Sequence, residues 1–245
     1  MGKITDAVKH LIILNVIFFA ASSNMGPQLT NWFGLYFPGS PNFGIWQFIT
    51  HMFMHGGFMH ILFNMYALWA FGSPLEQMWG RNKFLFFYLS AGIGAGLIYT
   101  AVNYFQFNSI YNELTSLGLQ AADIQSILQS GRYNTAILES ISEDKIVELY
   151  QIYNTPAVGA SGAIYGVLVA FGMSYPNAKL ALIFLPVPIA AKYFIPVLIA
   201  IDLFSGVTGF SIFGGGIAHF AHVGGALIGF IMMKYWQKNQ FKRWN

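Results

Sequence analysis

The sequence contains no cysteine and very little charge. Of its 245 residues, only 9% are Asp, Glu, Lys or Arg. The missing cysteine excludes a disulfide framework and any thiolate metal site. A soluble domain carries about 25% charged residues, so this chain has too little charge to cover a surface that faces water. Its net charge is only +3, and its basic residues are scattered or terminal, which excludes the clustered basic surface of a nucleic-acid-binding protein.

The sequence is instead rich in apolar and aromatic residues. Hydrophobic residues make up 56% and aromatic residues 18% of the chain, and the mean hydropathy is +0.53. A membrane-spanning helix needs about 20 mostly apolar residues. We predict six spans, near residues 5–23, 57–79, 83–104, 161–176, 190–206 and 217–237. The fold class expected is therefore all-α, with residues 1–245 forming a single integral membrane domain.

Two apolar segments need separate treatment. The first apolar segment, residues 11–20, follows Lys3 and Lys9 and could belong to a cleaved signal peptide. We favour an uncleaved first helix. Residues 180–189 contain Pro186 and Pro188. Because proline interrupts the hydrogen bonding of a helix interior, we expect an interfacial connection there and not a seventh span.

The distribution of basic residues predicts the orientation in the membrane. With six spans, ten of the 12 Lys and Arg residues fall on one side, and only Arg132 and Lys145 fall on the other. Basic residues are enriched in cytoplasmic loops. We therefore expect both termini in the cytoplasm. Our prediction for the membrane itself is the bacterial inner (plasma) membrane.

The connection between the third and fourth spans, residues 105–156, is long and acidic. It holds six of the nine acidic residues and lies on the outer side. Ile146, Leu149, Tyr150 and Tyr153 follow the spacing of an amphipathic helix, for which Ser142 is a suitable N-cap. We predict an extramembrane helical insertion that packs on the membrane face; a substrate-selecting element is the alternative.

Polar residues inside spans indicate function, and the first such cluster holds three histidines. His51, His55 and His60 are followed by Asn64, which shares a helix face with His60. A metal site, a structural role and a set of hydrogen-bond donors for catalysis all remain open. Against zinc, the metalloprotease pattern H-E-x-x-H is absent and no acidic residue lies nearby.

Two further clusters lie at the starts of the fourth and sixth spans. Ser161 lies between Gly159 and Gly162, at the start of a span too short to cross the membrane, so we expect it below the outer surface. Gly162 and Gly166 also suit simple helix packing. His222 lies one turn into the last span at a matching depth and is followed by Gly225 and Gly229, which permit close helix contact.

Together these clusters resemble the rhomboid family of intramembrane serine proteases over about residues 46–230. The matching pieces are His55, His60-Ile61-Leu62-Phe63-Asn64, Gly159-Ala160-Ser161-Gly162 with Tyr165, and Ala221-His222 with Gly225 and Gly229. Each motif alone is weak, but the ordered set is specific. The resemblance implies cleavage of transmembrane proteins, including single-span proteins, in contact with lipid. We expect no cofactor, no metal and no nucleic-acid partner.

The resemblance also implies residue roles. Ser161 would be the nucleophile and His222 its general base, a Ser–His dyad. His60, Asn64 and the Ser161 N–H would form the oxyanion hole, and Tyr165 would pack on the His222 ring. His55, Gly159, Gly162, Gly225 and Gly229 would support the site.

Some features depart from the family pattern or lie outside it. The family often has a Trp-Arg pair in the first outer loop, whereas here Trp46 precedes Gln47, which puts the structural role of that loop in doubt. For His222 we expect no carboxylate partner, and we expect Asp202 to be structural. The glycine-rich residues 205–216 are expected to form a loop that caps the site, with Gly214, Gly215 and Gly216 supplying flexibility.

Two other functions compete with proteolysis. A non-catalytic rhomboid-like protein would bind membrane clients without cleaving them, but such relatives typically lack the nucleophile or the base, and both are present here. A transporter would also place polar groups near the membrane centre, but the chain shows no internal repeat.

Overall fold

The computed structural model describes residues 3–182, 185–210 and 218–240. Its main helices are α1 (Asp6–Met25), α2 (Pro27–Phe33), α3 (Gln47–Thr50), α4 (Phe58–Ala67), α5 (Ser73–Trp79), α6 (Arg81–Ser116), α7 (Ala121–Ser130), α8 (Glu143–Asn154), α9 (Ser161–Ser174), α10 (Ala191–Thr208) and α11 (His219–Gln240). Short helical turns are η1 (His51–Phe53), η2 (Leu68–Gly72) and η3 (Thr135–Glu139), and the strands are β1 (Lys179–Leu182) and β2 (Leu185–Ala190).

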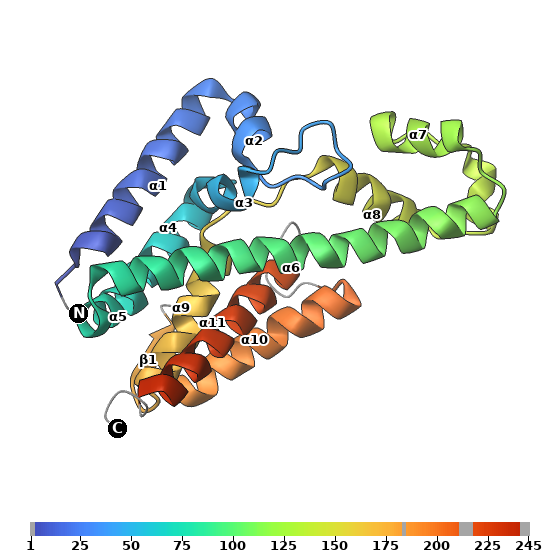
Figure 1. The fold of residues 1–245 in the computed structure, drawn as a ribbon. Helices are drawn as coiled ribbons and strands as arrows, with labels where there is room; N and C mark the ends of the chain where they lie inside the picture. Colours follow the sequence, from blue (N-terminus) through green and yellow to red (C-terminus); the bar gives the residue numbers. More distant parts are fainter. Residues whose placement is uncertain (1–2, 183–184, 211–217, 241–245) are drawn as a thin grey trace.

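The helices confirm an all-α membrane bundle. The predicted spans correspond in order to α1, to α4–η2–α5, and to α6, α9, α10 and α11. By length and composition alone, α1, α6 and α10 are sufficient to cross a membrane, and α9 is a shorter apolar helix. The first turn of α1 and the last turn of α11 lie toward the same side of the bundle (Figure 1), as the charge distribution predicts.

Helix α9 occupies the centre of the bundle, where it packs against α6 and α11. It is apolar on all sides, and its residues from Gly162 to Phe171 are almost all buried, as expected for a helix without a solvent face. Its 14 residues span about 21 Å at about 1.5 Å each. That is less than the roughly 30 Å of the hydrocarbon core, so the helix brings its first residue, Ser161, below the membrane surface.

Small residues allow α9 and α11 to touch along their backbones. A Cβ added at Gly225 would overlap the carbonyl group of Gly162, and one at Gly229 would lie 2.7 Å from the Cα of Gly166. The close packing predicted from these glycines is therefore confirmed. It sets the distance between the two helices that carry Ser161 and His222.

The insertion between the third and fourth spans has a hydrophobic core of its own. Helix α6 continues to Ser116, and α7 and α8 lie beside its outer end (Figure 1). Buried aliphatic side chains from all three helices form this core: Ile110, Leu114, Ile124, Ile127, Leu128, Ile146 and Leu149. The predicted amphipathic helix is confirmed as α8. Ser142 occupies its N-cap position, but the side chain makes no capping hydrogen bond.

The proline-containing segment after α9 is a β-hairpin, which the sequence did not predict. Strands β1 and β2 pair antiparallel, with Lys179 opposite Ala190 and Leu180 opposite Ile189. Pro186 and Pro188 fall in β2. Proline is tolerated there because each strand of a two-stranded sheet has a free edge. The segment is no span, as expected, but it is more regular than the predicted connection.

Gln47 organises the first outer loop. Its side chain is fully buried. Its Oε1 accepts from the backbone N–H of Tyr36 at 3.1 Å, and its Nε2 donates to the backbone oxygens of Asn42 at 2.8 Å and Trp32 at 3.3 Å. The doubt raised by the replaced arginine is therefore resolved: the amide joins both arms of the loop.

We expect Gln47→Ala to destabilise the protein. The substitution leaves the buried backbone N–H of Tyr36 without an acceptor, at a cost of about 1–3 kcal/mol. A melting temperature several degrees below that of the wild type, measured in detergent, is the predicted result. Gln151→Ala, which removes an exposed glutamine from α8, is the matched control and should change the melting temperature little. Equal melting temperatures for the two variants would contradict this role of Gln47.

Candidate active site

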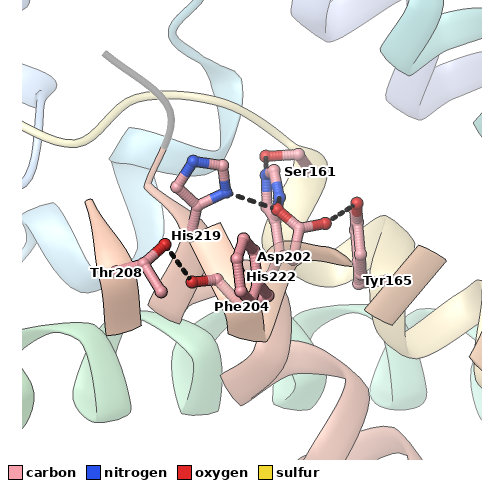
Figure 2. Close-up of polar contacts among 7 residues, drawn as sticks. All are labelled: Ser161, Tyr165, Asp202, Phe204, Thr208, His219 and His222. Carbon is pink, nitrogen blue, oxygen red and sulfur yellow. Dashed lines mark hydrogen bonds and ion pairs between the residues drawn. The ribbon is translucent and has the colours of Figure 1, made fainter. Parts of the chain in front are cut away.

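Ser161 and His222 are in hydrogen-bonding contact. Ser161 is the first residue of α9, and His222 lies in the first turn of α11. The His222 Nε2 is 2.8 Å from the Ser161 Oγ (Figure 2). The alcohol and the imidazole, from residues that are 61 positions apart in the chain, thus meet between two helices, as the sequence predicts.

Tyr165 holds the His222 ring on one face. It lies one turn after Ser161, on the same side of α9. Its ring is stacked on the imidazole, with the centroids 4.3 Å apart and the planes at 12°. The predicted packing of Tyr165 on His222 is confirmed.

Asp202 is the carboxylate partner of His222, and the expectation that none exists is wrong. Its Oδ1 lies 3.0 Å from the His222 Nδ1 and 2.6 Å from the Nδ1 of His219, while Tyr165 donates its hydroxyl to Oδ2 (Figure 2). An ionised carboxylate only accepts hydrogen bonds. The Nδ1 of His222 therefore carries the proton, which leaves the lone pair of Nε2 facing Ser161.

Sequence reasoning missed this contact because Asp202 lies on α10, 20 residues before His222. A signal was nevertheless present. A carboxylate within an apolar helix requires a partner, and Asp202 is only 2% exposed. His219 and His222 begin the next helix and, three residues apart, share one face of it.

Gly159 shapes the space in front of Ser161. Its φ of +128° disfavours any residue with a side chain, and an added Cβ would lie 2.8 Å from the His60 Nε2 and 3.4 Å from the Ser161 Oγ. His60 and Ser161 therefore border one small space that only glycine leaves open. The Gly159 N–H donates to the carbonyl of His51 at 3.0 Å, which fixes the position of this turn.

The remaining polar residues of the first cluster gather around His60. Asn64 is one turn later on α4 and is 7% exposed, and its Nδ2 has no hydrogen-bond partner among the described residues. His55 is buried, with its ring edge-on to that of His60 and the centroids 5.0 Å apart. The structure thus brings Ser161, His222 and His60 together, whereas the place of Asn64 in the oxyanion hole stays a prediction.

The three-histidine metal alternative finds no support in the described part of the chain. His51 bonds instead through Nδ1 to the carbonyl of Gln47 at 2.7 Å. Within residues 3–182, 185–210 and 218–240, the one convergent group of three metal-ligand side chains is Asp202, His219 and His222.

The family of the chain follows from comparison with known proteins. A sequence model of the rhomboid domain matches residues 42–238, which include every residue of the site. The chain belongs to the rhomboid family. Rhomboids are generally intramembrane serine proteases, although some members are inactive.

Curated relatives match most of this rhomboid but only a minor part of their own length. The human presenilin-associated rhomboid-like protein, mitochondrial, is 29% identical over 75% of this chain and 36% of its own. Rhomboid protein 1, mitochondrial, of Saccharomyces cerevisiae is 27% identical over 78% of this chain and 41% of its own. The rhomboid protease GluP of Bacillus subtilis is 44% identical over 48 residues, 20% of this chain and 10% of its own.

The segment before the last helix of this rhomboid differs in part from the expected loop. Residues 205–208 are not loop but the last turn of α10, in which the Thr208 hydroxyl donates to the Phe204 carbonyl (Figure 2). Gly214, Gly215 and Gly216 lie outside the described residues, so the capping role of this segment stays a prediction.

Proposed function

We propose that this rhomboid is an intramembrane serine endopeptidase that cleaves transmembrane proteins. The observation that carries the proposal is the 2.8 Å contact between the Ser161 Oγ and the His222 Nε2. A serine hydroxyl is a weak nucleophile until a base accepts its proton, and this geometry supplies the base.

The reaction follows from that contact. As the Oγ of Ser161 attacks the scissile carbonyl carbon, its proton passes to the His222 Nε2. The same proton then passes to the leaving amine as the C–N bond breaks, which leaves an acyl-enzyme. A water molecule, deprotonated by His222, releases the second product and restores Ser161.

The developing oxyanion needs donors in front of Ser161. His60, Asn64 and the backbone N–H of Ser161 are our candidates, because His60 borders the space that Gly159 leaves open and Asn64 lies one turn beyond it. A donor of this kind contributes about 2.7–4 kcal/mol to transition-state stabilisation in a soluble protease. His55 supports His60, and Gly162, Gly225 and Gly229 keep the two site helices close.

Asp202 acts in this scheme as a positioning residue. It holds the His222 Nδ1–H, which fixes the tautomer and stabilises the imidazolium that forms. Asp202→Asn should lower kcat by about 100-fold or more, since the same change in a soluble triad costs about 10⁴.

A comparison of kcat with KM tests the role of Asp202. Only the chemical step depends on the tautomer of His222, so KM should change little. The melting temperature controls for folding, and Asn108→Ala, a polar change at a half-buried position on α6, is a variant that should retain wild-type kcat. A folded Asp202→Asn protein with wild-type kcat would remove Asp202 from the mechanism.

The substrates and location follow from the family and the charge pattern. We propose substrates with one or more membrane spans, both termini in the cytoplasm, and residues 1–245 as one membrane domain, because α6 runs without interruption from the bundle into the insertion. The bacterial inner membrane stays a prediction. Two of the relatives carry the word mitochondrial in their names, and the third is a Bacillus protein.

Reconstitution in liposomes tests the proposed function. Purified protein is mixed with a panel of single-span substrates in ¹⁸O-labelled water, and the products are analysed by mass spectrometry. We expect paired fragments from at least one substrate, with one labelled oxygen at the new carboxyl terminus. Substrates that bind without being cleaved across the panel would favour the non-catalytic client-binding alternative.

A further inference from the structure

The carboxylate that orients His222 also belongs to a set of metal-ligating atoms. The Oδ1 of Asp202 lies 2.6 Å from the Nδ1 of His219 and 3.0 Å from the Nδ1 of His222 (Figure 2). One ligand atom from each of the three residues lies within 4.8 Å of the other two. We propose that these residues bind a zinc-type divalent ion, and that this ion inhibits the protease.

The donor set favours a borderline transition metal. Two imidazole nitrogens and one carboxylate oxygen, with a fourth position for water, match the ligands of open zinc sites. Magnesium and calcium prefer oxygen ligands throughout, so they compete poorly for this set. The chain has no cysteine, and its thiolate-free site therefore suits zinc better than copper(I).

The surrounding structure already orients these ligands. His219 and His222 are held on one face of α11, and Asp202 is fixed by the Tyr165 hydroxyl on Oδ2, which leaves Oδ1 directed at the histidines. Partners that orient metal ligands in this way raise metal affinity. The side chains are 10% exposed for His219 and 13% for His222, so the two rings are mostly enclosed and each keeps a small exposed area.

Inhibition follows because the metal ion and the catalytic reaction need different protonation of the two nitrogens of the His222 ring. Catalysis requires the proton of neutral His222 on Nδ1 and the lone pair on Nε2, facing Ser161. A metal ion needs the lone pair of Nδ1, so the ring proton moves to Nε2. His222 then has no lone pair with which to accept the proton of Ser161. This consequence rests on the proposed function, whereas the binding of the ion does not.

Binding is measured first in the Ser161→Ala protein, where no activity is needed. The metal-free protein in detergent competes with a chromogenic chelator for added zinc. We expect one tightly bound zinc ion per chain. Introducing His219→Gln as well should weaken zinc binding by about tenfold or more, because glutamine is a poor zinc ligand. Glutamine is chosen because it can still donate a hydrogen bond to Asp202.

Matched histidine variants locate the site. His10 is exposed near the start of the chain, so His10→Ala in the same background should bind zinc as tightly as its parent. His55→Ala tests the separate histidine pair with His60 and should also leave zinc binding unchanged. Unaltered binding in the His219→Gln protein, or loss of binding in either control, overturns the proposal.

Inhibition is then measured with the active enzyme. Zinc should reduce the cleavage rate in a saturable way, EDTA should restore it, and magnesium at the same concentration should have no effect. For His219→Gln, compared with its own zinc-free rate, the half-inhibiting zinc concentration should rise by about tenfold or more. If zinc binds at this site but cleavage continues at the zinc-free rate, the inhibitory part is wrong. An enzyme inactive even without zinc would instead contradict the proposed function and leave the binding result intact.

Discussion

Replacing Ser161 by alanine should reduce cleavage of a single-span substrate to the rate in liposomes without the enzyme. The substitution removes the oxygen that forms the acyl-enzyme, and Ser161 is the hydroxyl that is hydrogen-bonded to the His222 Nε2. Loss of the nucleophile in a soluble serine protease lowers kcat by about 2 × 10⁶-fold, which is below detection in most assays of membrane substrates.

A second buried serine provides the control. Ser73, at the start of α5, is 2% exposed, and its hydroxyl has no partner among the described residues. Ser73→Ala therefore removes the same atom from a buried position on a helix that carries no residue of the site, and it should retain wild-type cleavage. Both variants should melt within a few degrees of the wild type, because one net hydrogen bond is worth only about 0.5–1.5 kcal/mol. Wild-type cleavage by folded Ser161→Ala would refute the assignment of the nucleophile.

His222→Ala should have an effect of similar size for a different reason. Ser161 keeps its hydroxyl, but nothing accepts the proton as the oxygen attacks. The loss of the base costs about as much as the loss of the nucleophile in a soluble triad. The product rate should again fall to the background value.

Chemical rescue separates a base from a structural residue. The shortened side chain leaves space beside Tyr165 and Asp202, the groups that contact the ring in the wild type. Added imidazole should occupy that space and restore part of the activity of His222→Ala but not of Ser161→Ala. His10→Ala, an exposed change, controls for general effects of losing a histidine. Cleavage by unrescued His222→Ala near the wild-type rate would show that another group is the base.

The spans were predictable from the sequence because membrane helices must satisfy a simple requirement for length and hydropathy. The start of α9 at Ser161 agrees with the predicted span of residues 161–176. The first turn of α11 contains His222, as expected. The extension of α6 to Ser116 was not predicted. A helix that leaves the membrane no longer needs apolar residues, and a polar helix resembles a loop in its composition.

The contacts between helices were harder to predict than the helices. The pairing of Ser161 with His222 was accessible only through the order of several motifs, since nothing in either local sequence specifies its partner. Asp202 was assigned a structural role because the sequence does not show which residues of two consecutive helices come into contact. Gln47 shows the same limit: its amide bonds to backbone groups 5 and 11 residues away, and no pattern of side chains encodes those bonds.

The central claim is that Ser161 is a nucleophile activated by His222, and covalent labelling tests it most directly. A fluorophosphonate probe reacts with an activated serine oxygen, and the modified residue is identified by mass spectrometry of peptides from the labelled protein. We predict one adduct, on Ser161, in the wild type, and none in the His222→Ala protein. A folded wild-type protein that remains unlabelled, or that is labelled on a different serine, would contradict the account.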